Sequence, residues 1–127
     1  MRNISVALTQ PQILARTKTV TRRVGWLWLV EAFAEEPDYF CLLQPVEKGQ
    51  GIPKGGHITP VGGPIRVLGA RREMLDEVIV SPEYGTLECE AEGFPNLTPT
   101  EFVHFFCKTH PSTVPTSEIT RIQFEYT

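Results

Sequence analysis

The order of predicted elements indicates an α+β fold, a small β-barrel flanked by short helices. Alternating apolar and polar residues predict strands near both ends of the chain, and two helices with start signals precede the last strand. Strands and helices do not alternate regularly, which argues against a parallel α/β sheet. We expect the strands at the two termini to pair and close the barrel, with the two helices covering its open side.

The length and composition indicate one globular domain spanning residues 1–127. The net charge of −3 excludes a globally basic nucleic-acid binder, so any contact with phosphate needs a local basic patch. Cys41, Cys89 and Cys107 lack C-x-x-C spacing, which favours free thiols in a reducing compartment. No stretch resembles a signal peptide or a membrane span, so we expect a cytoplasmic protein. The oligomeric state is left open.

The first predicted elements are a strand and a short helix. Residues 3–8 alternate as a strand does. Thr9 then caps a helix that has a proline in its first turn and ends near Arg16 or Thr17. Ile13 and Leu14 are expected to pack this helix onto the core.

Residues 19–24 form the next predicted strand because they are rich in β-branched side chains. The alternation places Thr19, Thr21 and Arg23 on one face and Val20, Arg22 and Val24 on the other. Burial of the two valines would present Thr21 and Arg23 on the opposite face. Lys18 lies where the helix meets the strand, and the bend there can bring it toward Thr21.

Residues 26–72 are predicted to contain two strands, a long loop and one element of ambiguous type. Residues 26–33 fit either a short helix or a bent strand, and residues 39–46 fit a strand. Residues 44–64 hold six of the ten glycines and four of the eleven prolines, so they are expected to form mostly loop and tight turns. Residues 64–72 are predicted to be a strand.

Two helices and a strand complete the prediction. The first helix starts after Ser81 and ends at Gly93. Thr98 caps the second, with Glu101 completing a capping box. Residues 118–126 alternate as a closing strand, with Ile122, Phe124 and Tyr126 facing inward.

Basic side chains gather in two places. The first group is Arg16, Lys18, Arg22 and Arg23, with no acid between them, and the second is Arg66, Arg71 and Arg72. The acids Glu31, Glu35, Glu36 and Asp38 cluster elsewhere. Each basic group fits a phosphate-binding patch and an ordinary solvated face equally well.

Several familiar sites are excluded or disfavoured. No G-x-S-x-G elbow is present, and residues 49–55 lack the lysine-serine ending of a P-loop and the spacing of a dinucleotide fingerprint. His104, Cys107 and His110 are residue types that zinc prefers, but positions three apart drift around a helix. Cys107 is expected to pack as a small hydrophobic residue. We therefore expect no metal and no cofactor.

The segment from Lys18 to Arg23 is the best candidate for chemistry. Neighbouring positive charges lower the pKa of a lysine, which makes Lys18 a candidate base. The hydroxyl of Thr21 becomes a nucleophile once a base takes its proton, and Glu92 is a candidate to orient or accept that proton. The alternative is a solvated strand edge, which composition alone slightly favours.

The motif Lys18-Thr19-Val20-Thr21-Arg22-Arg23 after a short helix resembles the signature of the ASCH domain family, in particular a phage and bacterial branch. The resemblance covers nearly the whole chain and continues in order through Val46-Glu47-Lys48-Gly49, Ile65-Arg66-Val67, Glu92-Gly93-Phe94-Pro95, Glu101-Phe102-Val103 and Thr120-Arg121-Ile122. It implies a PUA-like barrel that binds RNA or a modified nucleotide in a cleft lined by Lys18, Thr21 and Arg23. Further ligand contacts are expected from Arg16, Thr19, Arg22, Trp26, Lys48 and Arg66. Trp26 and Trp28 are candidates to stack on an unpaired base, with core packing as the alternative for at least one of them.

The same resemblance implies an alternative function. A small bacterial relative is an amidohydrolase that removes the acetyl group of N4-acetylcytidine with a lysine, a threonine three residues later and a glutamate in a later helix. By motif, these positions match Lys18, Thr21 and Glu92 as catalytic residues. A ribonuclease acting on single-stranded RNA and a non-enzymatic protein-interaction module are further alternatives.

One segment departs from the family pattern. The acidic residues 30–40 replace a shorter turn. Such an insert can close over the cleft or repel phosphate, which favours a nucleoside over a long RNA as the ligand.

Overall fold

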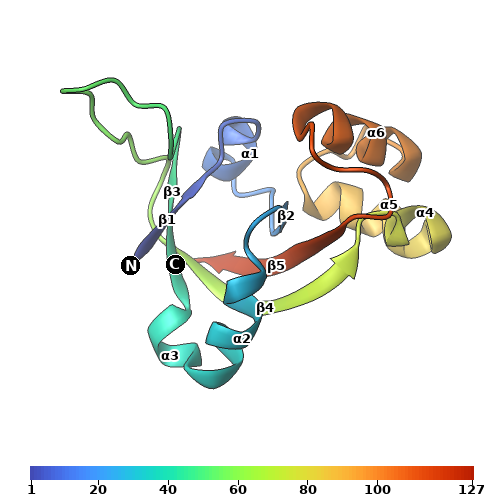
Figure 1. Ribbon diagram of the computed structural model, residues 1–127, viewed down its shortest axis with the longest axis horizontal. Coiled ribbons are helices and arrows are strands. Elements are labelled where there is room, and N and C mark those ends of the chain that lie inside the picture. Colours follow the sequence, from blue (N-terminus) through green and yellow to red (C-terminus); the bar gives the residue numbers. More distant parts are fainter.

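The computed structural model describes all 127 residues as a five-stranded mixed sheet with six helices (Figure 1). The strands are β1 (Arg2–Ser5), β2 (Val20–Arg23), β3 (Leu42–Val46), β4 (Ile65–Met74) and β5 (Glu118–Tyr126). The helices are α1 (Gln10–Leu14), α2 (Leu27–Glu35), α3 (Pro37–Phe40), α4 (Glu77–Val80), α5 (Pro82–Ala91) and α6 (Pro99–Thr109). The α+β class predicted from the sequence is confirmed.

The sheet is open, with strand order β1-β3-β4-β5-β2. β1 runs parallel to β3, and every other pair is antiparallel. The expected pairing of the two terminal strands is wrong, because both sides of β5 are already occupied by β4 and β2. β1 and β2 are therefore the two edges. A register shift between Val67 and Gly69 interrupts β4, and such bulges bend a strand and increase its twist.

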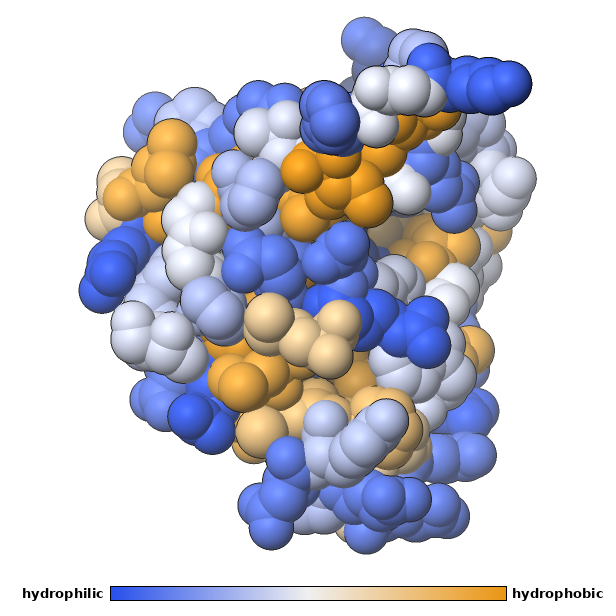
Figure 2. Space-filling view, turned by 90° about the vertical axis from the view of Figure 1, so that its left-hand side faces the viewer, coloured by the Kyte–Doolittle hydropathy of each residue, from blue (hydrophilic) through white to orange (hydrophobic).

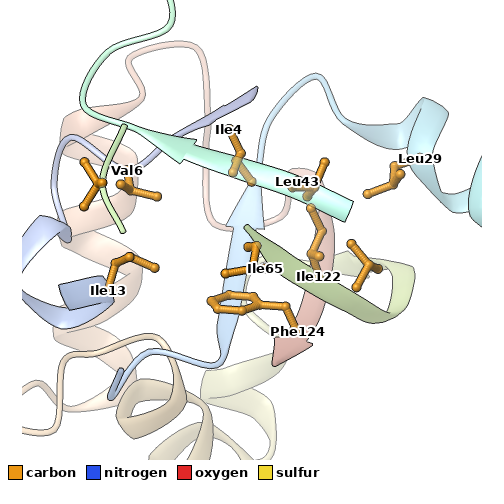
Figure 3. Packing of buried hydrophobic residues seen from close by; sticks show 10 residues of the cluster. Ile4, Val6, Ile13, Leu29, Leu43, Ile65, Ile122 and Phe124 are labelled. Carbon is orange, nitrogen blue, oxygen red and sulfur yellow. The ribbon is translucent and has the colours of Figure 1, made fainter. Parts of the chain in front are cut away.

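The larger core fills the concave side of the bent sheet (Figure 3). Its buried members are Ile4, Val6, Ile13, Leu29, Leu43, Val61, Ile65, Val67, Ile122 and Phe124. Ile13 anchors α1 to this core as expected. The same expectation for Leu14 is wrong, because α1 has only five residues and Leu14 lies on its exposed side.

A second core joins α4, α5 and α6 to the ends of β4 and β5. Its buried members are Leu75, Val78, Cys89, Phe102, Val103, Phe106 and Ile119. The predicted capping box of α6 is confirmed: Thr98 Oγ1 accepts from the backbone N–H of Glu101, and the Glu101 carboxylate accepts from that of Thr98. These helices cover one end of the sheet, while α2 and α3 lie at the other (Figure 1).

Between residues 24 and 64 the structure settles one ambiguous element and differs from two predictions. Residues 26–33 fall mostly in the helix α2, not in a bent strand. The strand predicted over 39–46 begins only at Leu42, because Pro37 opens the short helix α3. Val24, expected to be buried, is exposed because β2 ends at Arg23. The predicted loop over 44–64 is confirmed apart from the last residues of β3 and one isolated bridge between Val46 and Pro60.

We expect Gly85→Ala to destabilise the fold by about 3 kcal/mol, the upper end of ordinary overpacking. A Cβ at Gly85 would lie 1.9 Å from the carbonyl oxygen of Val78, so α4 and α5 would have to move apart. Urea unfolding of both proteins measures the difference. Gly63→Ala is the matched control, because nothing lies within 4 Å of its Cβ position. Equal stability of the two variants would contradict this account of helix contact.

Candidate functional site

A cavity of about 240 Å³ lies beside the free edges of the two edge strands. Residues 5–9, at the end of β1 and just after it, form one side. β2, the end of α5 and one face of α6 form the others. The lining residues are Ser5, Val6, Ala7, Leu8, Thr9, Lys18, Thr21, Arg22, Arg23, Glu92, Phe94, Phe102, Phe105, Phe106, Thr109 and His110. The missing β1–β2 pairing therefore leaves room for a binding site.

β2 contributes side chains from both of its faces to the cavity because it is an edge strand. Thr21 lies opposite Ile122 and therefore shares the face of the larger core. Arg22 lies opposite Arg121 on the other face, toward α5. Both residues still reach the cavity, since no further strand covers this edge.

Lys18 and Glu92 form a buried ion pair at the base of this site. Lys18 Nζ lies 2.9 Å from Glu92 Oε1 and 2.8 Å from the backbone oxygen of the same residue. Burial lowers the pKa of Lys18, and the attraction of Glu92 offsets this only in part. The charges of Arg23 and Arg22 lower it further. Lys18 is therefore more readily deprotonated than a surface lysine, as a general base requires.

Arg22 fixes Glu92 from the other side. Its Nη1 lies 3.0 Å from Glu92 Oε2, and its Nη2 lies 2.7 Å from Glu73 and 2.6 Å from Glu88. Burial alone lowers the pKa of Arg22, but the three carboxylates outweigh it and raise the pKa. Arg22 lines the cavity, but its donors are bound to protein carboxylates. A ligand contact by Arg22 stays a prediction.

Arg121 and Tyr84 extend this network to the surface. Arg121 donates to both oxygens of Glu88, and the Tyr84 hydroxyl lies 3.0 Å from Glu88 Oε1. Burial raises the pKa of Glu88, yet the hydrogen bonds from Arg121 and the charge of Arg22 bring it down to about 2. Burial and the bond to Glu73 raise the pKa of Tyr84 to about 12. The Glu88 carboxylate is therefore ionised at neutral pH and held by several donors.

Thr21, which is buried, and Arg23, which is half-buried, form the rest of the polar wall. Arg23 Nε donates to Thr21 Oγ1 at 3.0 Å, which leaves the hydroxyl hydrogen of Thr21 free for another acceptor. Arg23 makes no ion pair. Burial lowers its pKa to about 10, with Glu92 opposing, so it stays charged at neutral pH. Arg23 is thus the cation of this cavity that is available to a ligand.

Phenylalanines form the opposite wall. Phe94 lies 6.1 Å from Phe102 and 5.3 Å from Phe105 between ring centroids, and Phe102 lies 6.3 Å from Phe106. His110 stacks on Phe106 at 4.1 Å with nearly parallel planes. Its Nδ1 lies 2.9 Å from the Phe106 backbone oxygen, so the proton belongs on Nδ1 and Nε2 is left to accept. The cavity therefore combines an aromatic wall with a polar, basic one.

The structure brings together five of the ten residues predicted for the site. Lys18, Thr21, Arg22, Arg23 and Glu92 line the cavity. The other five, which are Arg16, Thr19, Trp26, Lys48 and Arg66, do not.

Three of the five outlying residues have contacts elsewhere in the protein. Arg16 adopts a positive φ of 60° and lies over the ring of Tyr126. Trp26 packs beside Trp28 against the larger core, which accounts for it without a ligand. Arg66 is exposed on β4, 3.9 Å from Glu125.

Sequence reasoning missed the aromatic wall and the contribution of residues 5–9. The periodicity of α6 marks its phenylalanines as buried, but it does not distinguish a core from a cavity wall. His110 lines the cavity with them, while no group of three histidines, cysteines or acids is arranged to hold a metal ion. Comparison of the chain with protein-family models, with curated proteins and with solved structures finds no match. No helix has the length and apolar character needed to cross a membrane.

Proposed function

We propose that this chain binds a nucleobase-containing ligand, an RNA nucleotide or a modified nucleoside, in the cavity beside β2. The observation that carries the proposal is the pairing of a phenylalanine wall with Thr21 and the unpaired Arg23. A nucleobase is flat and apolar on its faces and carries donors and acceptors on its edge. It therefore complements an aromatic wall on one side and a polar wall on the other.

The size and charge of the site agree with such a ligand. A cavity of about 240 Å³ is smaller than the roughly 300–1,000 Å³ typical of drug-sized ligands, and it suits one base better than a folded RNA. The carboxylates near the cavity are already bound by Lys18, Arg22 and Arg121. Arg23 is thus free to bind a base carbonyl or a phosphate.

The resemblance to the ASCH family supports the same proposal. It places the Lys18–Arg23 segment at a nucleotide cleft, and the cavity adjoins that segment. We extend the proposal to the fold: the sheet around the larger core is an opened form of a PUA-like barrel, in which β1 and β2 separate at the ligand site.

We expect Arg23→Met to weaken binding of cytidine 5′-monophosphate by about tenfold to a hundredfold. This is the loss expected for a charge-assisted hydrogen bond of about 1.5–3 kcal/mol. Isothermal calorimetry with cytidine and with its monophosphate measures the effect and shows whether Arg23 contacts base or phosphate. Arg66→Met removes the same charge outside the cavity and is expected to bind as the wild type does. Unchanged affinity of Arg23→Met for both ligands would contradict the proposal.

Amide hydrolysis of an N4-acetylcytidine-like nucleoside is a second candidate, favoured by the Lys18–Glu92 contact of 2.9 Å. In this scheme neutral Lys18 takes the proton of Thr21, whose Oγ1 attacks the acyl carbon. The C–N bond then breaks, the amine leaves with a proton, and water hydrolyses the acyl-threonine to acetate. Glu92 orients Lys18 and bears the compensating charge.

Mass spectrometry of N4-acetylcytidine and a short single-stranded RNA incubated with the protein tests this candidate. The scheme predicts acetate and cytidine as products and an intact RNA. Cleavage of the RNA would favour the ribonuclease alternative. If neither compound reacts, the hydrolase scheme is wrong, and the binding proposal is judged by calorimetry alone.

A further inference from the structure

A second cavity, of about 390 Å³, lies at the opposite end of the sheet from the basic site. It is lined by Met1, Arg2, Trp28, Leu29, Tyr39, Phe40, Leu42 and Leu43. No residue of this set lines the first cavity. Figure 2 faces the side of the molecule that carries β1, β3 and α3, and apolar residues gather below its centre with hydrophilic ones along the lower border. We call this second cavity the aromatic cavity.

The rings around the aromatic cavity stand at steep angles to one another. Trp28 and Phe40 are 6.2 Å apart at 66°, and Tyr39 and Phe40 are 4.7 Å apart at 75°. Trp26 lies 5.3 Å from Trp28 on its other side. Because these rings are oriented differently, the faces of more than one ring can contact the same group. Aromatic cages that bind cationic groups have this arrangement.

A cation already occupies one of these surfaces. The guanidinium carbon of Arg2 lies 4.3 Å from the ring centroid of Trp28, well inside the range of a cation–π contact of about 6 Å. Arg2 is exposed and makes no ion pair. The contact shows that the ring of Trp28 accepts a guanidinium, and nothing but the ring holds that guanidinium in place.

Acidic side chains follow the rings of the aromatic cavity along the chain, and the positive groups in its lining are Arg2 and the N-terminal ammonium of Met1. Residues 24–46, which include α2, α3 and β3, contain no lysine, arginine or histidine. They contain the exposed acids Glu31, Glu35, Glu36 and Asp38, and of these only Glu31 makes an ion pair, with Arg72. Three carboxylates therefore remain uncompensated beside the rings and attract a cation.

We propose that the aromatic cavity binds the guanidinium or ammonium group of a basic segment of a protein partner, which displaces Arg2 from Trp28. The π-surfaces take the cationic head, the apolar lining takes the aliphatic stem, and the acids of α2 and α3 attract neighbouring basic residues. This inference does not depend on the proposed nucleobase site. It gives the acidic insert and the two tryptophans a role that the first cavity does not use.

Tryptophan fluorescence reads this site directly, because Trp26 and Trp28 are the only tryptophans of the chain and lie together. The probe is a short arginine-containing peptide, and the matched control is the same peptide with citrulline, which keeps the shape and loses the charge. The proposal predicts a saturable fluorescence change with the arginine peptide and none with the citrulline peptide. An equal response to both peptides, or none to either, would overturn it.

Two substitutions with opposite expected effects separate a specific site from general attraction to acidic residues. Arg2→Ala removes the internal competitor and is expected to raise the affinity for the arginine peptide severalfold. Trp28→Leu removes the π-surface and is expected to lower it about tenfold, with the fold verified by circular dichroism. Lys108→Ala removes an equal charge from α6, no residue of which lines this cavity, and serves as control for Arg2→Ala. Equal peptide affinity of Arg2→Ala and Lys108→Ala would show that only net charge matters and would overturn the proposal.

Discussion

Replacing Arg22 with methionine is expected to lower the free energy of unfolding by about 3–5 kcal/mol, the cost of leaving buried charges without their partner. The side chain of Arg22 is inaccessible to solvent and is shared by Glu73, Glu88 and Glu92. A natural domain has a total stability of only about 5–15 kcal/mol, so the variant is expected to approach unfolding. Urea unfolding at pH 7 measures the loss. The exposed pair Arg66–Glu125 provides the control: Arg66→Met is expected to cost less than about 1 kcal/mol.

The same variant has a pH signature. In the wild type the pKa of Glu88 is lowered to about 2. Its stabilising contribution is therefore complete above the unfolded pKa of about 4.3 and is lost as the pH falls toward 2. Without Arg22 the three acids lose a shared cation, so their ionised forms are less stable in the folded state even though Arg121 still binds Glu88 and Lys18 still binds Glu92. Protonation then relieves part of the loss. The stability difference between wild type and Arg22→Met is thus expected to be smaller at pH 4 than at pH 7, and a difference independent of pH would contradict the charge network.

Thr21→Val is expected to abolish any acetate release from N4-acetylcytidine, by a factor of about 10⁴ or more, because it removes the attacking oxygen. Valine matches threonine in shape, and Thr21 Oγ1 accepts only from Arg23, so the fold should persist. Mass spectrometry measures acetate release, and calorimetry measures cytidine binding. Loss of acetate release with retained cytidine binding would identify Thr21 as the nucleophile. Full hydrolytic activity of Thr21→Val would exclude this role.

Local sequence signals were sufficient to predict the helices and strands whose ends are marked by neighbouring residues. The capping box at Thr98, the glycine that ends α5 and the alternation of β5 each depend on neighbouring residues. They were predicted correctly for that reason. The pairing of β1 was not, because strand pairing is decided between distant segments: β1 joins β3, some forty residues away, and leaves β5 to β4 and β2.

The candidate site was predictable only in part for the same reason. Lys18, Thr21 and Arg23 lie within one short segment, whereas Glu92 is 74 residues from Lys18, and no spacing in the sequence shows that the two meet. Nothing in the sequence indicates that Arg22 collects acids from β4 and α5. The phenylalanines of α6 show a buried helix face, but whether that face meets a core or a cavity depends on the pairing of β1 and β2, which local sequence does not decide.

The central claim is that a nucleobase binds between the phenylalanine wall and β2, and ligand mapping by NMR tests it most directly. Cytidine added to protein labelled at phenylalanine rings and arginine side chains is expected to shift the signals of Phe94, Phe105 and Arg23 and to leave the indole signals of Trp26 and Trp28 in place. Shifts confined to the tryptophans, or none at saturating cytidine, would contradict the claim.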